Sequence, residues 1–245
     1  MNRQTVVYHL ENGVATLTLN RPEARNAISR RLLADMESAL DEVAAAADAR
    51  TVVLTGAGDK AFCAGADLKE RAGMSPEDVA DFLRTINRLY TAIQNFRLPV
   101  IAAVNGAAFG GGLEMAMAAD IRLAAESAVM GLTETRLAII PGAGGTQRMP
   151  RLVGMAKAKE LILTGRRIDA REALDIGLVN DIHPQEKLLD MSRKLAGEIG
   201  EGGPIAVQQA KAAINKGMET DLQSGLPSNR MRMPGASPPR TGWRV

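Results

Sequence analysis

Cysteine and histidine are scarce in this sequence, and their scarcity excludes several kinds of chemistry. The chain of 245 residues has one cysteine, Cys63, and two histidines, His9 and His183. One thiol cannot form an internal disulfide or a four-thiolate zinc or iron–sulfur centre, and two imidazoles cannot build a three-histidine metal site. We therefore expect no metal centre, and any catalysis must depend on other side chains.

The sequence also has no long apolar run, and its first residues give no reason to expect a leader segment. The longest uncharged stretch, residues 98–113, is interrupted by glycines and ends at Glu114. It is shorter than the roughly 20 apolar residues that cross a bilayer. The first residues lack the basic segment and the apolar core of a secretory signal. We therefore expect a cytoplasmic protein without a membrane partner.

The excess of basic residues is small and lies at the C-terminus. The chain has 30 basic and 28 acidic residues, but its last 20 residues contain four arginines and no acid. The helix predicted over residues 29–47 also carries more acidic than basic residues, and such a face repels phosphate groups. The charge pattern therefore does not favour a nucleic-acid partner.

The hydrophobic pattern predicts alternating strands and helices. The composition, 46% hydrophobic and 24% charged, is typical of one globular domain, alone or with a small appendage. Residues 6–10 and 14–19 alternate apolar and polar side chains around a turn, which predicts a β-hairpin. Apolar residues at three- and four-residue spacing predict a helix over residues 29–47. Residues 51–55 and 99–104 are typical of buried strands.

The order of these elements predicts an α/β fold. Ser75 as an N-cap before Pro76 predicts a helix that continues to about Asn95. Further strands are expected near residues 121–123 and 128–130. The last third of the chain has almost entirely helical periodicity. We therefore predict an α/β fold with parallel strands and a helical C-terminal region.

Two glycine-rich segments are candidates for ligand binding. Residues 56–61 formally match a dinucleotide fingerprint, but no helix follows them, so we interpret them as a turn. Gly110, Gly111 and Gly112 open a helix, whose unpaired N–H groups attract an oxygen that carries negative charge. Glu114 lies in the first turn of that helix. Its desolvated carboxyl group either exchanges protons near neutral pH or merely complements the helix dipole.

A second carboxylate stands beside another glycine-rich turn. Glu134 precedes an apolar run that ends in the glycines of residues 141–145. Alone, Glu134 is equally consistent with an ion pair to Arg136 or with exposure to solvent. Together with Glu114, it is more typical of a catalytic pair around one small substrate group.

Three longer segments contain these glycines and carboxylates. They are AFCAGADLKE at residues 61–70, GAAFGGGLEMAMAADIRLA at residues 106–124 and MGLTETRLAIIPGAGGTQRMPR at residues 130–151. In sequence and in order they resemble the signature segments of the enoyl-CoA hydratase/isomerase (crotonase) superfamily. The resemblance extends from about Val6 to Leu226, and it is strongest to the enoyl-CoA and methylglutaconyl-CoA hydratases. It implies a crotonase-like spiral of ββα units with a helical C-terminal region, assembled as a trimer or a dimer of trimers.

The resemblance also implies roles for individual residues. The backbone N–H groups of Ala66 and Gly111 would form an oxyanion hole for the thioester carbonyl of an acyl-CoA substrate. Glu114 would deprotonate the water that attacks C3, Glu134 would protonate C2, and the backbone of Gly142 would hold the water. Family members that isomerise or cleave commonly lack one of the two carboxylates, so the presence of both favours hydration.

Coenzyme A is expected as part of the substrate, and no separate cofactor is implied. The residues expected to contact it are Arg25, Ala64, Asp67, Leu68 and Lys69. For Arg25 and Lys69, a position as solvated surface residues is an open alternative.

The predicted function is that of an enoyl-CoA hydratase, a hydro-lyase that converts a trans-2-enoyl-CoA to the 3-hydroxyacyl-CoA. The reaction belongs to fatty acid β-oxidation or to branched-chain amino acid degradation. Within the family, the alternatives are a methylglutaconyl-CoA hydratase and an enoyl-CoA isomerase. The alternative of another class is a non-catalytic protein that binds acyl-CoA or RNA.

The C-terminal part departs from the family pattern. We expect a spiral core over residues 1–200, an incomplete helical region of the trimerisation type over residues 201–226, and an atypical, disordered tail over residues 227–245. A shifted reading frame over residues 235–245 is able to encode RIPTEDRVEG, a family-like string. We therefore hypothesise a frame error near Leu226, which the DNA sequence across that point would test.

Overall fold

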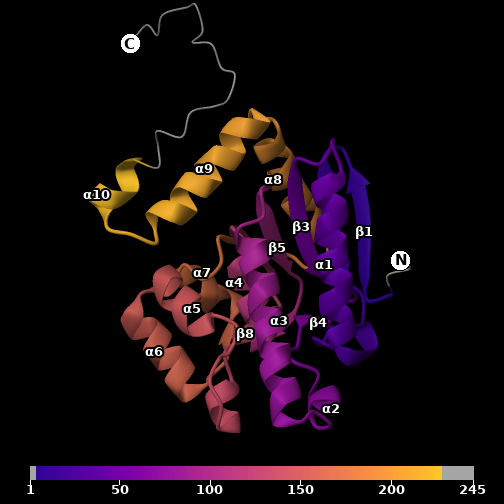
Figure 1. The fold of residues 1–245 in the computed structure, drawn as a ribbon, viewed down its shortest axis with the longest axis vertical. Helices are drawn as coiled ribbons and strands as arrows, with labels where there is room; N and C mark the ends of the chain where they lie inside the picture. The colour runs from indigo at the N-terminus through magenta and orange to yellow at the C-terminus, as the bar shows by residue number, and fades with distance from the viewer. Residues whose placement is uncertain (1–3, 228–245) are drawn as a thin grey trace, which may run out of the picture. The chain divides into compact units, whose positions relative to one another are not determined.

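The computed structural model describes residues 4–227 of the chain (Figure 1). The chain divides into two units, one that ends at Glu201 and one that begins at Gly202. The first unit contains every strand found in the described residues and every residue predicted for the site. The segment 228–245, which holds most of the predicted tail, lies outside the described residues.

The larger of the two sheets has six strands in the order β1-β2-β3-β5-β7-β10. The strands are β1 (Val6–Glu11), β2 (Val14–Leu19), β3 (Thr51–Gly56), β5 (Val100–Val104), β7 (Ile121–Ala125) and β10 (Asp181–His183). β1 and β2 form the predicted antiparallel hairpin, and the other neighbouring strands are parallel. Every residue of β3 and β5 is buried, as expected for parallel strands that are covered on both faces.

The smaller sheet has four short strands in the order β4-β6-β8-β9. They are β4 (Ala61–Cys63), β6 (Ala107–Phe109), β8 (Val129–Gly131) and β9 (Ile168–Asp169). The chain repeatedly passes from a strand of the large sheet to a strand of the small sheet and then to a helix: β3 to β4, β5 to β6, and β7 to β8. This repeated ββα passage confirms the predicted α/β spiral fold.

Helices connect and cover the strands. In the first unit they are η1 (Pro22–Ala24), α1 (Arg30–Ala45), α2 (Leu68–Arg71), α3 (Pro76–Gln94), α4 (Gly111–Ala118), η2 (Glu134–Leu137), α5 (Gly145–Val153), α6 (Met155–Thr164), α7 (Ala170–Asp175) and α8 (Leu188–Gly200). Ser29 caps α1 by accepting from Leu32 N, and Ser75 forms a capping box with Asp78 at the start of α3. The long helix α3 packs against both α1 and α4 (Figure 1).

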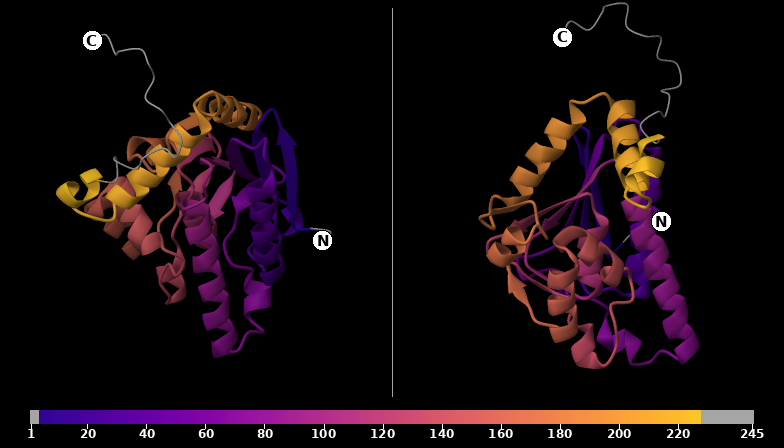
Figure 2. Two further views of the ribbon diagram at one scale, coloured as in Figure 1. Left: turned by 45° about the horizontal axis from the view of Figure 1, so that its top comes forward. Right: turned by 90° about the vertical axis from the view of Figure 1, so that its left-hand side faces the viewer.

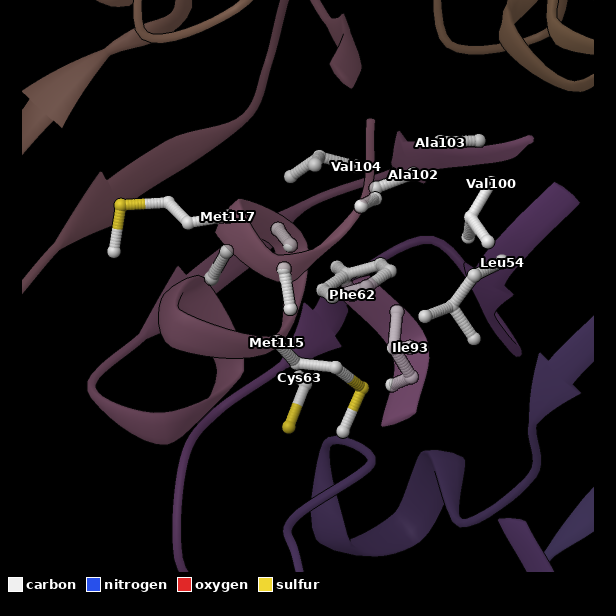
Figure 3. Close-up of a cluster of buried hydrophobic side chains, with 14 of the residues drawn as sticks. Leu54, Phe62, Cys63, Ile93, Val100, Ala102, Ala103, Val104, Met115 and Met117 are labelled. Carbon is white, nitrogen blue, oxygen red and sulfur yellow. The ribbon is translucent and has the colours of Figure 1, made fainter. Parts of the chain in front are cut away.

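Side chains from both sheets meet those of α3 and α4 in one core (Figure 3). Leu54 and Val104 come from the large sheet, Phe62 from the small sheet, Ile93 from α3 and Met115 from α4, and each is at most 1% exposed. α4 is buried along most of its length. Its first turn, which carries a carboxylate, is therefore held away from bulk water.

Two local predictions are wrong, and strand β4 at residues 61–63 was not predicted. The last third of the chain is not almost entirely helical, because β9 and β10 interrupt the helices. Asp35, one of the acidic residues of the helix predicted over residues 29–47, does not contribute to a face that repels phosphate, because it is only 5% exposed and accepts hydrogen bonds from Thr5 N and Oγ1. In each case a contact with a distant segment decides the local structure.

The described part of the second unit consists of α9 (Pro204–Gly217) and α10 (Leu222–Gly225), drawn in yellow in Figure 2. Neither helix has a buried residue. Within residues 4–227, no helix is long and apolar enough to cross a membrane.

Candidate active site

A cavity of about 730 Å³ lies beside the start of α4. Its wall is formed by segments that are far apart in the sequence: the chain between β4 and α2, one face of α3, the start of α4, and the loop that follows β8. Its larger apolar residues are Ile28, Leu68, Leu83, Ile86, Phe109, Leu137, Ile139 and Ile140. The predicted carboxylates Glu114 and Glu134 both line it, so an apolar group and two acids share one space.

Glu114 is buried in the first turn of α4, with 2% of its surface exposed. Its Oε1 accepts hydrogen bonds from Ala143 N at 2.8 Å and from Gly145 N at 2.7 Å. Burial raises the pKa of Glu114, and the two N–H donors oppose this shift because they bind the ionised form better. The result is a desolvated carboxylate that is held in one orientation and is ready to accept a proton.

Glu134 lies at the start of η2, and its environment differs from that of Glu114. Burial raises the pKa of Glu134 to about 7, with a further contribution from the negative charge of Glu114. Its Oε2 is buried without a hydrogen-bond partner among the described residues. The alternative pairing with Arg136 is not formed, since the Arg136 Nε donates to Thr164 O. Near neutral pH a large fraction of Glu134 therefore carries a proton.

The backbone N–H groups of Ala66 and Gly111, both on the cavity wall, have no acceptor among residues 4–227. Ala66 forms a parallel bridge with Ile28, and the bridge uses the carbonyl of Gly65 and the N–H of Asp67. The N–H of Ala66 therefore points away from Ile28. Gly111 is the first residue of α4, where the N–H has no partner within the helix.

Glycines let these two segments approach each other closely. Gly65 has a φ of +94°, and an added Cβ would lie 2.8 Å from Phe109 O and 3.7 Å from Gly111 N. Gly110 has a φ of +51°, and an added Cβ would lie 3.0 Å from an Oε1 of Glu134. A side chain at either position would separate the N–H groups or displace the carboxylate.

The turn over residues 142–145 supports Glu114 through the two backbone N–H groups that bind its Oε1. Gly142 lines the cavity, and its carbonyl accepts a hydrogen bond of 2.7 Å from Asn87 Nδ2. The carbonyl of Ala143 accepts one of 2.8 Å from the Arg148 guanidinium. Gly144 has a φ of +99°, which favours glycine. The turn is thus fixed by side chains from two helices.

The residues expected to contact coenzyme A occupy three different environments. Ala64 and Leu68 line the cavity. Arg25 lines a separate cavity of about 150 Å³, next to η1. Asp67 pairs with Arg21 at 2.8 Å and caps α2, which gives it a structural role in this state. Lys69 is exposed on α2 and does not line the cavity.

The segment that matches a dinucleotide fingerprint is a turn held by two amide side chains. Asn105 donates to Gly56 O and Gly58 O, and Asn26 donates to Ala57 O and Ala61 O. Strand β4 follows, so no helix presents its N-terminus to a phosphate. The interpretation as a turn is confirmed.

Four residues near the site were not found by sequence reasoning. Asn87 and Tyr90 lie on α3, where polar residues on an otherwise apolar helix face were the only signal. Arg71 and Arg167 line the cavity, and the Arg167 guanidinium lies 4.5 Å from the centre of the Phe109 ring. No motif distinguished these arginines from ordinary surface residues.

The scarce cysteine and histidine residues take no part in the site. Cys63 is fully buried, and burial raises the pKa of its thiol to about 12, so it is a poor nucleophile. Among the described residues, no group of three or more histidine, cysteine, aspartate or glutamate residues is arranged to hold a metal ion.

Comparisons of sequence and of structure with known proteins both find similar proteins. Residues 9–234 match the family model described as enoyl-CoA hydratase/isomerase. The YngF protein of Bacillus subtilis is 53% identical over 213 residues, which cover 87% of this chain and 82% of YngF. The mitochondrial methylglutaconyl-CoA hydratase of Mus musculus is 46% identical, over 90% of this chain and 72% of its own length. The crystal structure of enoyl-CoA hydratase from Bacillus anthracis superimposes with a TM-score of 0.91 at 49% identity, over 93% of this chain and 88% of that one.

Proposed function

Because the chain belongs to the enoyl-CoA hydratase/isomerase family, we propose that it is an enoyl-CoA hydratase, which adds water to a trans-2-enoyl-CoA and forms the 3-hydroxyacyl-CoA. The observation that carries this proposal is the position of Glu114 and Glu134 in one cavity with the free N–H groups of Ala66 and Gly111. The reaction needs an apolar wall for the acyl chain, one acid that accepts a proton from water and one that supplies a proton to carbon.

The first step is activation of the thioester. The N–H groups of Ala66 and Gly111 bind the carbonyl oxygen, and their attraction for it increases as the negative charge of an enolate develops. One such donor typically lowers a barrier by about 2.7–4 kcal/mol. The apolar cavity strengthens this interaction because it excludes water.

The second step is addition of water. Glu114 accepts a proton from water, the water oxygen bonds to C3, and the electron pair of the C2–C3 double bond moves toward the carbonyl oxygen. The N–H groups of Ala143 and Gly145 bind Glu114 Oε1, so that the other carboxylate oxygen is left to take the proton. The backbone of Gly142, on the cavity wall, helps to hold the water.

The third step is proton transfer to carbon. The enolate returns its electron pair, and C2 takes the proton of Glu134, whose pKa of about 7 keeps it partly protonated at neutral pH. Glu114 is then protonated and Glu134 is ionised. Exchange of protons with solvent restores both groups, so the sum is one water added to one enoyl-CoA.

The remaining contacts of the substrate are proposed from the same family resemblance. Coenzyme A would follow the chain near Arg25, Ala64, Asp67, Leu68 and Lys69, and no separate cofactor is needed. Assembly as a trimer or a dimer of trimers, a cytoplasmic location and a role in fatty acid or branched-chain amino acid degradation belong to the same proposal.

The two cavity arginines favour a second candidate, a methylglutaconyl-CoA hydratase. Within residues 4–227 the guanidinium groups of Arg71 and Arg167 form no hydrogen bond or ion pair, although both line the cavity. A substrate with a carboxylate at its far end would offer either guanidinium the partner it lacks. If this candidate is correct, Arg71→Met or Arg167→Met lowers kcat/KM for methylglutaconyl-CoA at least tenfold more than for crotonyl-CoA.

Loss of the conjugated enoyl-thioester absorbance of crotonyl-CoA tests the main proposal. We expect turnover by the parent protein, at least hundredfold slower turnover by Glu134→Gln, and unchanged turnover by Glu126→Gln, in which an exposed carboxylate is removed. A parent without turnover, or a Glu134→Gln variant as fast as the parent, contradicts the proposal.

A further inference from the structure

Three polar side chains form a stripe along one face of α3. Asn87, Tyr90 and Gln94 follow one another at spacings of three and four residues, which places them on the same side of a helix. Their neighbours Leu83 and Ile86 line the cavity. The stripe therefore faces the candidate active site, although none of its three members lines the cavity.

Asn87 acts on the peptide group between Gly142 and Ala143. Its Nδ2 donates to Gly142 O at 2.7 Å and to Leu83 O at 2.9 Å. The N–H of that same peptide group, on Ala143, donates to Glu114 Oε1 at 2.8 Å. Hydrogen bonds at both ends of one peptide group polarise and orient it. Asn87, by binding the carbonyl end, therefore fixes the direction of the Ala143 N–H group that donates to Glu114.

Gln94 reaches the next peptide group of the same turn through an arginine. The Arg148 guanidinium donates to Gln94 Oε1 at 2.8 Å and to Ala143 O at 2.8 Å. The Nε of Arg148 is thereby directed to α3, and its Nη1 is directed to the turn. The loop that supports Glu114 is thus attached to α3 at two successive carbonyl groups.

Tyr90 acts on the other half of the site. Its side chain is fully buried, and its hydroxyl donates to Gly111 O at 2.7 Å. Gly111 provides one of the two N–H groups proposed to bind the thioester carbonyl, and as a glycine it has no side chain to limit its rotation. The hydrogen bond from Tyr90 therefore limits how the first residue of α4 can turn.

We propose that Asn87, Tyr90 and Gln94 are positioning residues of α3. Through them, α3 holds the N–H groups of Ala143 and Gly145, which bind Glu114, at a fixed distance from the N–H group of Gly111, which binds the thioester carbonyl. This inference rests on the proposed hydration reaction. It adds that the distance between the water-activating and carbonyl-binding halves is set by one helix. No member of the stripe needs to touch the substrate.

The experiment compares Asn87→Leu and Tyr90→Phe with Thr91→Ala. Leucine approximates the shape of asparagine without its donor, and phenylalanine lacks only the hydroxyl. Thr91 is an exposed residue of α3 whose side chain forms no hydrogen bond among the described residues, so it serves as the matched control. A second variant, Asn87→Ala, carries the same expectation and replaces the leucine variant if that one does not fold.

Amide hydrogen exchange gives a readout that does not depend on turnover. In Asn87→Leu, we expect the amides of Ala143 and Gly145 to exchange at least tenfold faster than in Thr91→Ala, with the melting temperature and the other amides of α3 unchanged. Exchange rates equal to those of the control overturn the role of Asn87, whether or not crotonyl-CoA is hydrated.

Kinetics then separate positioning from packing. In Asn87→Leu, weaker hydrogen bonds to Glu114 raise the pKa of Glu114. The acid limb of the pH profile of kcat/KM therefore moves to higher pH, and kcat falls about tenfold.

In Tyr90→Phe, we expect kcat to fall severalfold and KM to change less than twofold. The acid limb of the pH profile should stay at the pH of the parent. Profiles of both variants that coincide with Thr91→Ala, while the parent is active, refute the inference and leave the hydratase proposal intact. A parent without turnover refutes the hydratase proposal instead.

Discussion

The six-stranded sheet and the four-stranded sheet differ in what their residues are used for. In the large sheet, all residues of β3 and β5 are buried, and most of them are apolar. The small sheet has strands of two or three residues, and the segments that leave its parallel strands carry Ala66, Gly111 and Glu134. The large sheet supplies stability, whereas the small sheet places reactive groups.

Each sheet has, in it or next to it, a buried side-chain oxygen without a hydrogen-bond partner among the described residues, and the two oxygens allow the sheets to be compared. Within residues 4–227, both Thr51 Oγ1 in the large sheet and Glu134 Oε2 next to the small sheet are buried without a hydrogen-bond partner. An unpaired polar atom costs stability wherever it occurs. We expect the unpaired hydroxyl of Thr51 to lower stability without any benefit to activity. We expect the unpaired carboxyl oxygen of Glu134 to lower stability but to be needed for catalysis.

The largest expected effect on stability comes from the large sheet. Leu17 on β2 is 1% exposed, and Leu17→Ala should lower the free energy of unfolding by about 2–5 kcal/mol because it leaves a cavity. Since Leu17 does not line the active-site cavity, kcat should stay within about twofold. Urea denaturation measures the change in stability, and the crotonyl-CoA assay measures kcat. A kcat that falls together with stability would contradict the different roles of the two sheets.

A smaller loss of stability, together with a loss of activity, is expected at Gly112. An added Cβ there would overlap Cys63 O, so Gly112→Ala should separate α4 from β4 at a cost of about 1–3 kcal/mol and lower kcat by moving Gly111. The matched control is Gly197→Ala on α8, where an added Cβ meets nothing within 4 Å. That variant should gain up to about 1 kcal/mol. Equal stabilities of the two variants would contradict this account.

Glu134 should give a pH dependence of both activity and stability. Its folded pKa of about 7 lies above the ordinary 4.5, so ionisation favours the unfolded chain, and stability falls as pH rises from about 4.5 through 7. Activity should fall up to tenfold per pH unit above 7, because the proton donor is lost. Glu134→Gln removes the penalty, so its melting temperature at pH 8 should exceed that of the parent by a few degrees, about 2–4 °C per kcal/mol. A melting difference that is the same at pH 5 and pH 8 would rule out this cause.

The smallest expected effect is at Thr51. Thr51→Val replaces the unpartnered hydroxyl with a methyl group of similar size, and unfolding should become less favourable by about 1 kcal/mol, with kcat unchanged. Chemical denaturation measures the change. A loss of stability would show that the hydroxyl has a partner in solution.

Sequence reasoning succeeded where a signal is local. The β-hairpin, the helix predicted from Ser29 and the N-cap at Ser75 depend on residues within a few positions of one another, and all three are confirmed. It failed for β4 and β9, because two or three residues are too few for a period, and their pairing with distant strands decides their conformation.

The site shows the same division. Glu114 and Glu134 were found because each stands beside a glycine-rich turn within a family-like segment. Asn87 and Tyr90 act from the middle of an amphipathic helix on carbonyl groups more than 20 residues away in the sequence. Nothing in the pattern of α3 indicates which residues it will face, so these contacts required the structure.

We propose that Glu114, supported by the turn over residues 142–145, directs water to C3 of an enoyl-CoA. The most direct test is incubation with crotonyl-CoA in water enriched in oxygen-18, followed by mass spectrometry of the CoA products. We predict a 3-hydroxybutyryl-CoA that carries the heavy oxygen, formed at least hundredfold more slowly by Glu114→Gln at an unchanged melting temperature. A parent that forms no labelled hydroxyl product, or a Glu114→Gln variant that forms it at the parent's rate, would contradict the claim.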